Sequence, residues 1–434
     1  MRRTALLPLL APPLLASPTL DILSQNVAGL PAFLNPNGEG DKTANSHELG
    51  RRFAQYNYDV IHVQEDFNYH AAIYESDGDA HPHRTATSGG AGIGSGLNTL
   101  ARYPWVDFER VKWETCSEAS GADCLTPKGY TRMRMRVEEG VYVDFYNLHA
   151  DAGSEEKDVA ARSANLQQVA DAIGADSAGN AVIVFGDTNA RYTSSGESVR
   201  AFTQEQGMKD PWVDIVLGGE EPVQGTPARK CDSPTKNQTC EVVDKIFYRG
   251  SRTINLSATS WRYEDDRFLQ DGKLLSDHNP IAANFTWERS ASLRQSDLFG
   301  GPHGTWFNDL ISLPTTTTKL TKISLRGEER VDSVGVTLSS GESFTHGGKG
   351  GKLDELQLEK DEFWTRATLC QGKKNDHTRI FYLRADTSAS RTVSAGAETD
   401  DCQSFEAADG WQIVGAFGQD GEEVDQLGFI YGLQ

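Results

Sequence analysis

The 434-residue sequence predicts a layered α/β domain over residues 20–287, followed by an all-β domain over residues 298–434. In the first region strand-like and helix-like segments alternate, as they do where helices cover a sheet. After residue 287 the pattern changes to short alternating segments separated by Gly and Asp, which indicates many short strands. The chain is long enough for each region to bury a core of its own.

The predicted elements follow one another in a regular order. Apolar runs and alternating residues predict strands at 20–26, 60–63, 141–146, 181–185, 242–247 and 281–285. Apolar residues at helical spacing predict helices at 46–58 and 157–173. Residues 288–297 are charged and rich in Ser, so we interpret them as a linker. In the second domain the segments 322–326 and 334–338 alternate as strands do.

The N-terminus has the order expected of a secretory signal peptide. Arg2 and Arg3 precede an apolar run from residue 5 to residue 16, and small residues follow that run. We therefore predict a signal peptide at residues 1–19 and an extracellular, secreted protein. The run is too short and too rich in Pro to span a membrane, and no later segment has ~20 apolar residues in succession. We expect no transmembrane segment.

The cysteines agree with secretion. Six cysteines permit 15 pairings, but pairing nearest neighbours closes short loops without crossing the predicted domain boundary. This choice predicts the disulfides Cys116–Cys124, Cys231–Cys240 and Cys370–Cys402. No pair has the CxxC spacing of a zinc or redox site, so structural disulfides in an oxidising compartment are favoured. Glycosylation sequons at Asn237, Asn255 and Asn284 fit the same compartment and predict a glycoprotein.

The charge balance limits the classes of partner. With 42 basic and 62 acidic residues the net charge is -20, which disfavours a protein that binds nucleic acid only by neutralising phosphates. A nuclease stays open, because one basic patch beside a divalent ion is sufficient for it. The acidic residues are spread along the chain, which is typical of a solvated surface.

Two short segments predict the chemistry. Asp187 and Asn189 directly follow the apolar strand 181–185, and Asp277 and His278 precede another apolar stretch. Oxygen donors suit a hard cation, and an imidazole suits proton transfer. Similar groups end nearly every predicted strand: Asn26, Glu65, His149, Asp187 with Asn189, and Asp244. Because ligand sites in layered α/β folds gather at strand ends, the set predicts metal-assisted hydrolysis of a phosphate ester.

Residues 20–287 resemble the endonuclease/exonuclease/phosphatase superfamily, whose fold is a four-layered α/β sandwich, and within it they look most like secreted bacterial neutral sphingomyelinases. The matching segments, in order, are SQNV, VQED, SGLNTLARYP, TPKGYTRMRM, NLHADAG, FGDTNAR, VDKIFY, TSW and SDHNPI. Nucleases and phosphoinositide phosphatases share most of these residues. The resemblance therefore implies a phosphodiesterase of the sphingomyelinase kind, with a deoxyribonuclease-like nuclease or an inositol phosphatase as alternatives.

The resemblance also implies a metal site. Asn26 and Glu65 would hold Mg²⁺ or another divalent cation, an ion that prefers oxygen ligands, and Asp277 could be a further ligand. Asp187 and Asn189 would position the attacking water or the phosphate.

Three further residues would carry the proton transfers and stabilise the transition state. His278 would be the general base, and Asp244 would orient it and stabilise its charged form. His149 would donate a hydrogen bond to the phosphate as negative charge grows on it.

Some residues depart from the sphingomyelinase pattern. Membrane-acting relatives carry an exposed aromatic hairpin, whereas residues 262–268 here are mostly charged, and Trp261 could be either a core residue or an anchor. His81-Pro82-His83 has the look of a metal pair, but its Pro and loop setting favour a solvated turn.

Residues 298–434 resemble a jacalin-like lectin, a β-prism of three sheets that binds glycans. The supporting segments are FGGPHGTWFNDL, RVDSVGVTLSSGESFTHGGKGG and WQIVGAFGQDGEEVDQLGFIYG. The resemblance implies a carbohydrate site that includes Gly301, Gly421, Glu423 and Asp425. That loop usually carries an aromatic residue in the family and does not here, so a prism that packs or binds something else is the alternative.

Together these features predict a secreted, Mg²⁺-dependent phosphodiesterase that acts on a phospholipid head group or nucleic acid and reaches glycosylated surfaces through a lectin domain. A lectin-type binding protein with an inactive front domain is a further alternative. The complete set of predicted site residues argues against it.

Overall fold

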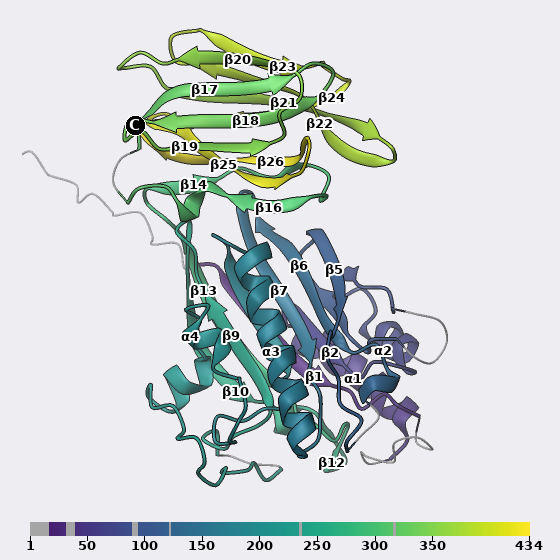
Figure 1. Ribbon diagram of the computed structural model, residues 1–434. Coiled ribbons are helices and arrows are strands. Elements are labelled where there is room, and N and C mark those ends of the chain that lie inside the picture. Colours follow the sequence, from purple (N-terminus) through teal and green to yellow (C-terminus); the bar gives the residue numbers. More distant parts are fainter. Residues whose placement is uncertain (1–16, 32–39, 89–93, 121–122, 234–236, 316–317) are drawn as a thin grey trace, which may run out of the picture.

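The computed structural model describes residues 17–31, 40–88, 94–120, 123–233, 237–315 and 318–434 (Figure 1). Most of the predicted signal peptide lies outside these residues. Two sheets with flanking helices form the lower part of the view in Figure 1, and three further sheets form the upper part. The fold is therefore mostly β-sheet.

The first part of the chain forms a six-stranded and a five-stranded sheet. The six-stranded sheet has the spatial order β10 (Ile254–Tyr263), β13 (Ile281–Arg289), β1 (Thr19–Asn26), β2 (Val60–Gln64), β4 (Asn98–Ala101) and β3 (His83–Arg84). The five-stranded sheet has the order β5 (Trp105–Lys112), β6 (Gly129–Glu138), β7 (Val141–His149), β8 (Ala181–Asp187) and β9 (Asp244–Arg249). A small hairpin joins β11 (Leu269–Gln270) to β12 (Lys273–Leu274).

The two sheets pack face to face, and alternation along the strands explains how. Ile22 of β1 lies in the core that also contains Phe145 and Ile183 of the other sheet. Its neighbour Leu23 points to the opposite face, where it packs with Phe53 of α1 (Lys42–Tyr56). The other helices are α2 (His70–Asp77), α3 (Glu156–Asp176) and α4 (Ala201–Gln204). The predicted order of four layers stays a prediction.

Within the described residues, three short 3₁₀ turns and one π-helical turn complete the helical segments. They are Asp123–Leu125, Asp265–Arg267, Asp309–Ile311 and, as the π turn, Trp212–Val216.

The C-terminal part contains three antiparallel sheets around one core, which matches a β-prism. One sheet has the order β14 (Leu293–Gln295), β26 (Val424–Leu433), β25 (Trp411–Asp420) and β16 (Thr305–Asn308), with β15 (Phe299–Gly300) on β26. The second has the order β19 (Ser343–Gly347), β18 (Val331–Leu338), β17 (Leu320–Gly327) and β20 (Lys352–Gln357). The third has the order β23 (Thr392–Gly396), β22 (His377–Thr387), β21 (Trp364–Lys374) and β24 (Asp401–Glu406).

The two parts of the chain are in direct contact. The guanidinium of Arg134 in β6 lies 3.4 Å from the ring centroid of Trp306 in β16. Trp306 Nε1 donates to the carbonyl of Ala178, which follows α3. Arg136 forms two hydrogen bonds with the carboxylate of Asp297. The segment predicted as a linker contains the end of β13 and the whole of β14, so it is part of two sheets rather than a free connection.

The three predicted disulfides are confirmed: Cys116–Cys124, Cys231–Cys240 and Cys370–Cys402. Each bridge joins residues of the same part of the chain. Among the described residues, no helix combines the length and apolar character required to cross a membrane.

Candidate active site

The strand register brings the predicted site residues to one edge of the two sheets. β7 and β8 are parallel and place His149 beside Asp187. β9 runs antiparallel to β8, so its first residue, Asp244, also lies beside Asp187. In the other sheet β1 ends at Asn26, and Glu65 follows the parallel neighbour β2. This edge lies at the opposite end of β7 and β8 from the C-terminal sheets (Figure 1).

Asn26 connects the carboxylates of the two sheets. Its Nδ2 donates to Oε1 of Glu65 at 3.0 Å and to Oδ2 of Asp187 at 3.1 Å. The backbone φ angle of Glu65 is +57°, a left-handed conformation that is rare for residues other than glycine. Burial raises the pKa of Glu65, and the carboxylates of Asp277 and Asp187 raise it further, against the opposing effects of Asn26 and Lys128.

His278 and Asp244 form a hydrogen-bonded pair. Nδ1 of His278 lies 2.9 Å from Oδ2 of Asp244, which leaves Nε2 on the side of Asp187, 3.8 Å from Oδ2. Burial alone would lower the pKa of His278, but Asp244, Asp187 and Asp277 together hold it well above its usual value. The pair therefore has the geometry of a base oriented by a carboxylate.

His149 lies between a lysine and the carboxylates. Its Nε2 is 3.1 Å from Nζ of Lys128 and 3.6 Å from Oδ2 of Asp187. Burial lowers the pKa of His149 to about 3, with the positive charge of Lys128 acting in the same direction. Lys128 also forms an ion pair with Asp123. Burial and Lys128 thus both favour the neutral form of the His149 imidazole.

The remaining predicted residues lie around this group. Asn189 has a left-handed backbone (φ +50°), its N–H donates to Oδ1 of Asp187 at 2.9 Å, and its Nδ2 donates to the carbonyl of Ala150 at 3.1 Å. Asp277 is exposed, and Oγ of the preceding Ser276 donates to the carbonyl of Asn26 at 2.7 Å. The structure thus brings together all the predicted site residues of this region, with Asp277 at the rim.

The donors near Glu65 fit a divalent cation. Oε2 of Glu65 is buried and has no hydrogen-bond partner among the described residues. The carboxylates of Asp277 and Asp187 also raise the pKa of Glu65, an effect that a bound cation would relieve. A second set, Asp187, Asp244 and His278, places one donor atom each within 4.8 Å of one another. In this second set Asp244 and His278 already hydrogen-bond to each other.

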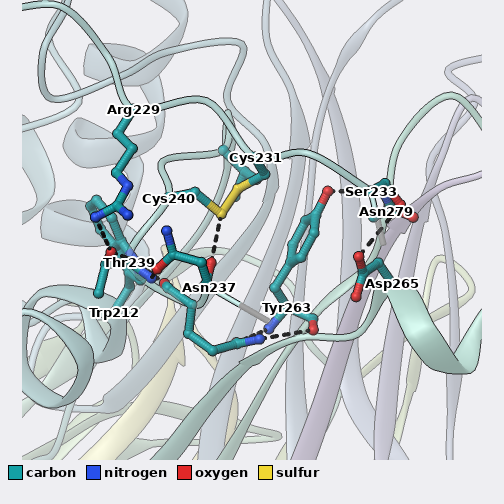
Figure 2. Close-up of a disulfide and its surroundings, with 12 residues drawn as sticks. Trp212, Arg229, Cys231, Ser233, Asn237, Thr239, Cys240, Tyr263, Asp265 and Asn279 are labelled. Atoms are coloured by element: carbon teal, nitrogen blue, oxygen red, sulfur yellow. Dashed lines mark hydrogen bonds between the residues drawn. A yellow bond between two sulfur atoms is a disulfide. The ribbon is translucent and has the colours of Figure 1, made fainter. Parts of the chain in front are cut away.

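The Cys231–Cys240 disulfide lies close to Tyr263 and Asn279, the residue after His278 (Figure 2). The bridge closes a loop, and Trp212 Nε1 donates to the carbonyl of Gln238 in it at 2.9 Å. Gln238 Oε1 accepts from the N–H of Tyr263 at 2.7 Å. The hydroxyl of Tyr263 in turn accepts from Nδ2 of Asn279, the residue after His278, at 2.8 Å. The bridge therefore supports the loop that carries the histidine.

Some residues differ from their sequence-based interpretation. Lys128 and Asp123 were not predicted as site residues, because an isolated lysine has no spacing that marks it. His81 does not lie in a solvated turn: it is fully buried and bonds Asp77 at 2.6 Å and the carbonyl of Tyr58 at 2.7 Å. Trp261 is 6% exposed and belongs to the core between the sheets, so it is not an anchor.

The four residues of the predicted carbohydrate site also lie together. Gly301 donates its N–H to the carbonyl of Asp425 at 3.0 Å, and a Cβ at Gly301 would lie 2.6 Å from the carbonyl oxygen of Thr378. Gly421 donates its N–H to the carbonyl of Glu423 at 3.0 Å, which closes the loop between β25 and β26. The Glu423 and Asp425 side chains are both engaged by basic side chains rather than free.

Comparison with known proteins finds two family models that match separate parts of the chain. Residues 41–214 match the model of Endonuclease/Exonuclease/phosphatase family 2, and residues 296–430 match the model of the Jacalin-like lectin domain. Sphingomyelinases of Mycobacterium bovis and Mycobacterium tuberculosis are each 35% identical to this chain over 272 residues. These matches cover 61% of this chain and 52% of each relative, so the chain spans about half the length of those curated relatives.

Solved structures of both kinds are similar to parts of the chain. Sphingomyelinase C from Streptomyces griseocarneus covers 62% of this chain and 99% of its own, with 18% identity and a TM-score of 0.43. A mannose-binding jacalin-related lectin from Ananas comosus covers 33% of this chain and 99% of its own, with 25% identity and a TM-score of 0.29.

Proposed function

Because this chain joins an endonuclease/exonuclease/phosphatase domain to a jacalin-like lectin domain, we propose that it is a secreted, Mg²⁺-dependent phosphodiesterase of the sphingomyelinase kind. Its C-terminal domain would hold the enzyme at glycosylated surfaces. The observation that carries the proposal is the convergence of the His278–Asp244 pair with Asn26, Glu65 and Asp187 on one sheet edge.

His278 is the proposed general base. Since Nδ1 donates to Asp244, the free Nε2 is the atom that takes a proton from the attacking water. The nearby carboxylates favour the protonated imidazole, and a cation held by those carboxylates would weaken that effect and favour the basic form. Asp244 then stabilises the imidazolium formed in the reaction.

Glu65 and Asn26 are the proposed cation ligands, with Asp277 as a further ligand from the rim. A divalent cation bound there supplies positive charge for the non-bridging phosphate oxygens. Lys128, which donates to Nε2 of His149 at 3.1 Å, can donate hydrogen bonds where negative charge develops on the phosphate. His149 can donate there as well when its ring proton is on Nε2 and Lys128 bonds the phosphate instead.

Sphingomyelin is the proposed substrate, supported by the 35% identity to proteins named sphingomyelinase. The test is a panel of sphingomyelin liposomes, plasmid DNA, RNA and inositol phosphates, each with Mg²⁺ and with EDTA. We expect release of phosphocholine from sphingomyelin only with Mg²⁺, and its loss in His278→Ala. Cleavage of DNA, RNA or an inositol phosphate, with sphingomyelin untouched, would assign the site to the nuclease or phosphatase alternative.

Secretion is also proposed, supported by the three disulfides and the basic, apolar N-terminal sequence. N-terminal sequencing of the exported chain should begin near residue 20. Of the three sequons, Asn255 is exposed, whereas Oδ1 of Asn284 accepts from Ser260 at 2.8 Å. Asn255 is therefore the position we expect to carry a glycan.

For the C-terminal domain we propose glycan binding at the loop of Gly421 and Asp425, beside Gly301. The boundaries 20–287 and 298–434, joined by residues 288–297, are the proposed domain division.

A further inference from the structure

The aspartate of the proposed glycan site is not free to accept sugar hydroxyls. Oδ1 of Asp425 forms an ion pair with NH1 of Arg379, which lies in β22. The Asp425 side chain is 3% exposed, whereas that of Arg379 is 24% exposed. A molecule approaching the loop therefore meets the guanidinium before it meets the carboxylate.

The neighbouring carboxylate of Glu423 is also covered by basic side chains that are more exposed than it is. Glu423 accepts from Arg330 at 3.0 Å and from Lys374 at 2.6 Å. The Glu423 side chain is 10% exposed, against 21% for Arg330 and 39% for Lys374. The rings of His303 and His377 lie 4.3 Å apart beside this group. Basic side chains thus form the outer layer and carboxylates the inner layer, on a chain whose net charge is -20.

The guanidinium of Arg379 also has unused capacity. Its Nε is buried and has no hydrogen-bond partner among the described residues, and it lies 3.8 Å from Oε2 of Glu423, beyond hydrogen-bond range. Glu422 is the exposed acidic residue of the loop. Among the described residues it forms no ion pair with Arg379, so it does not compete with a ligand for that side chain. Because 24% of the Arg379 side chain is exposed, an anionic group on a ligand could reach it and bind.

A sugar that binds Asp425 must replace Arg379 as its partner, and this exchange determines which sugars bind. A neutral sugar must break the Arg379–Asp425 pair to reach Asp425 and offers nothing charged to Arg379 in return. A sugar with a carboxylate or a sulfate can take Arg379 while its hydroxyls take Asp425, so both charges stay paired. We propose that this site selects acidic glycans and that Arg379 sets the preference. This inference rests on the proposed glycan binding.

The test is an array of immobilised neutral, uronic-acid, sialylated and sulfated oligosaccharides, probed with the full chain. For the wild type we expect apparent affinities for one or both acidic classes at least about tenfold above those for the neutral class. Comparison of the carboxylated oligosaccharides (uronic-acid and sialylated) with the sulfated ones shows which of the two anionic groups the site binds. In Arg379→Gln the acidic preference should disappear and neutral sugars should bind better, because Asp425 is then free.

Lys322→Gln is the matched control, because it removes a positive charge of the same domain that is paired with Glu355 and leaves the Arg379–Asp425 pair intact. This variant should keep the acidic preference and show no gain for neutral sugars. Asp425→Ala should lose both classes, and melting temperatures of all variants verify folding.

The outcomes separate this inference from the proposal on which it rests. Neutral glycans bound by the wild type as well as acidic ones, and lost in Asp425→Ala, would leave the lectin function standing and overturn the role of Arg379. No glycan bound by the wild type or by Arg379→Gln would overturn both. Acidic binding that is equal in wild type and Arg379→Gln would also overturn the inference, since the charge would then act elsewhere.

Discussion

Nδ1 of His278 lies 2.9 Å from Oδ2 of Asp244, and the two residues come from different sheets. Asp244 is the first residue of β9 in the five-stranded sheet, whereas His278 precedes β13 of the six-stranded sheet. The pair therefore forms only when both sheets are packed together, and its imidazole faces Asp187 between them.

The first prediction concerns this pair. His278→Ala should lower kcat by about 10²–10⁴-fold, because it removes the proton acceptor and nothing that the core requires. Asp244→Asn is the matched variant: it retains the shape but not the charge, and should lower kcat while KM changes little. Steady-state kinetics with unchanged melting temperatures check both. Activity of His278→Ala within tenfold of wild type would remove His278 from the mechanism.

The second prediction concerns the cation. Glu65→Gln should shift the Mg²⁺ dependence of activity to at least about tenfold higher concentration, because an amide replaces a charged ligand. Calorimetric Mg²⁺ binding provides a readout independent of turnover. Glu48→Gln, on α1 away from the edge, is the control and should titrate as wild type. Overlapping titrations of Glu65→Gln and wild type would show that Glu65 is not a ligand.

The third prediction concerns Lys128. Its positive charge helps to hold the pKa of His149 at about 3, so Lys128→Met should raise that pKa. An NMR titration of the His149 ring should move to higher pH, and kcat should fall together with it. Lys157→Met, on the exposed side of α3, serves as the control. An unchanged His149 titration would contradict the electrostatic role of Lys128.

The fourth prediction concerns the contact between the two parts of the chain. Trp306→Ala should lower the free energy of unfolding by about 3–5 kcal/mol, because it removes a large buried ring and uncovers the guanidinium of Arg134. Trp306→Phe retains a ring over Arg134 and loses the hydrogen bond to Ala178, so it should cost about 1 kcal/mol. Denaturant unfolding measures both. Equal effects of the two variants would show that the Arg134 contact contributes nothing.

Apolar patterns in the sequence predicted much of the fold. Where the prediction of an element failed, the structure shows the physical reason. The strand 181–185 is continuous and apolar and was found as Ala181–Asp187. The helix predicted at 46–58 begins earlier, at Lys42, because Asp41 accepts from the N–H of Ala44 and caps it. No strand was predicted at Gly129–Glu138, where arginines interrupt the apolar residues. In the structure Arg134 is fully buried and paired with Asp144.

The sequence predicted those site residues that end or directly follow an apolar strand. It did not predict two site residues in other positions, Lys128 and Arg379. Asn26, Glu65 and Asp187 follow or end apolar strands, so their meeting could be expected. Lys128 precedes a strand, and Arg379 lies 46 positions before Asp425, its ion-pair partner. Neither spacing nor composition indicates such long-range charge pairs, because they depend on how separate strands are placed.

The most direct test of the central claim is phosphocholine release from sphingomyelin liposomes by the metal-stripped protein, followed by addition of Mg²⁺. We predict no release after EDTA, recovery of activity with Mg²⁺ in the wild type, and no recovery in His278→Ala or Glu65→Gln. Phosphocholine release that persists in EDTA would contradict a metal-dependent phosphodiesterase site at this sheet edge. Full recovery of release by both variants on addition of Mg²⁺ would also contradict it.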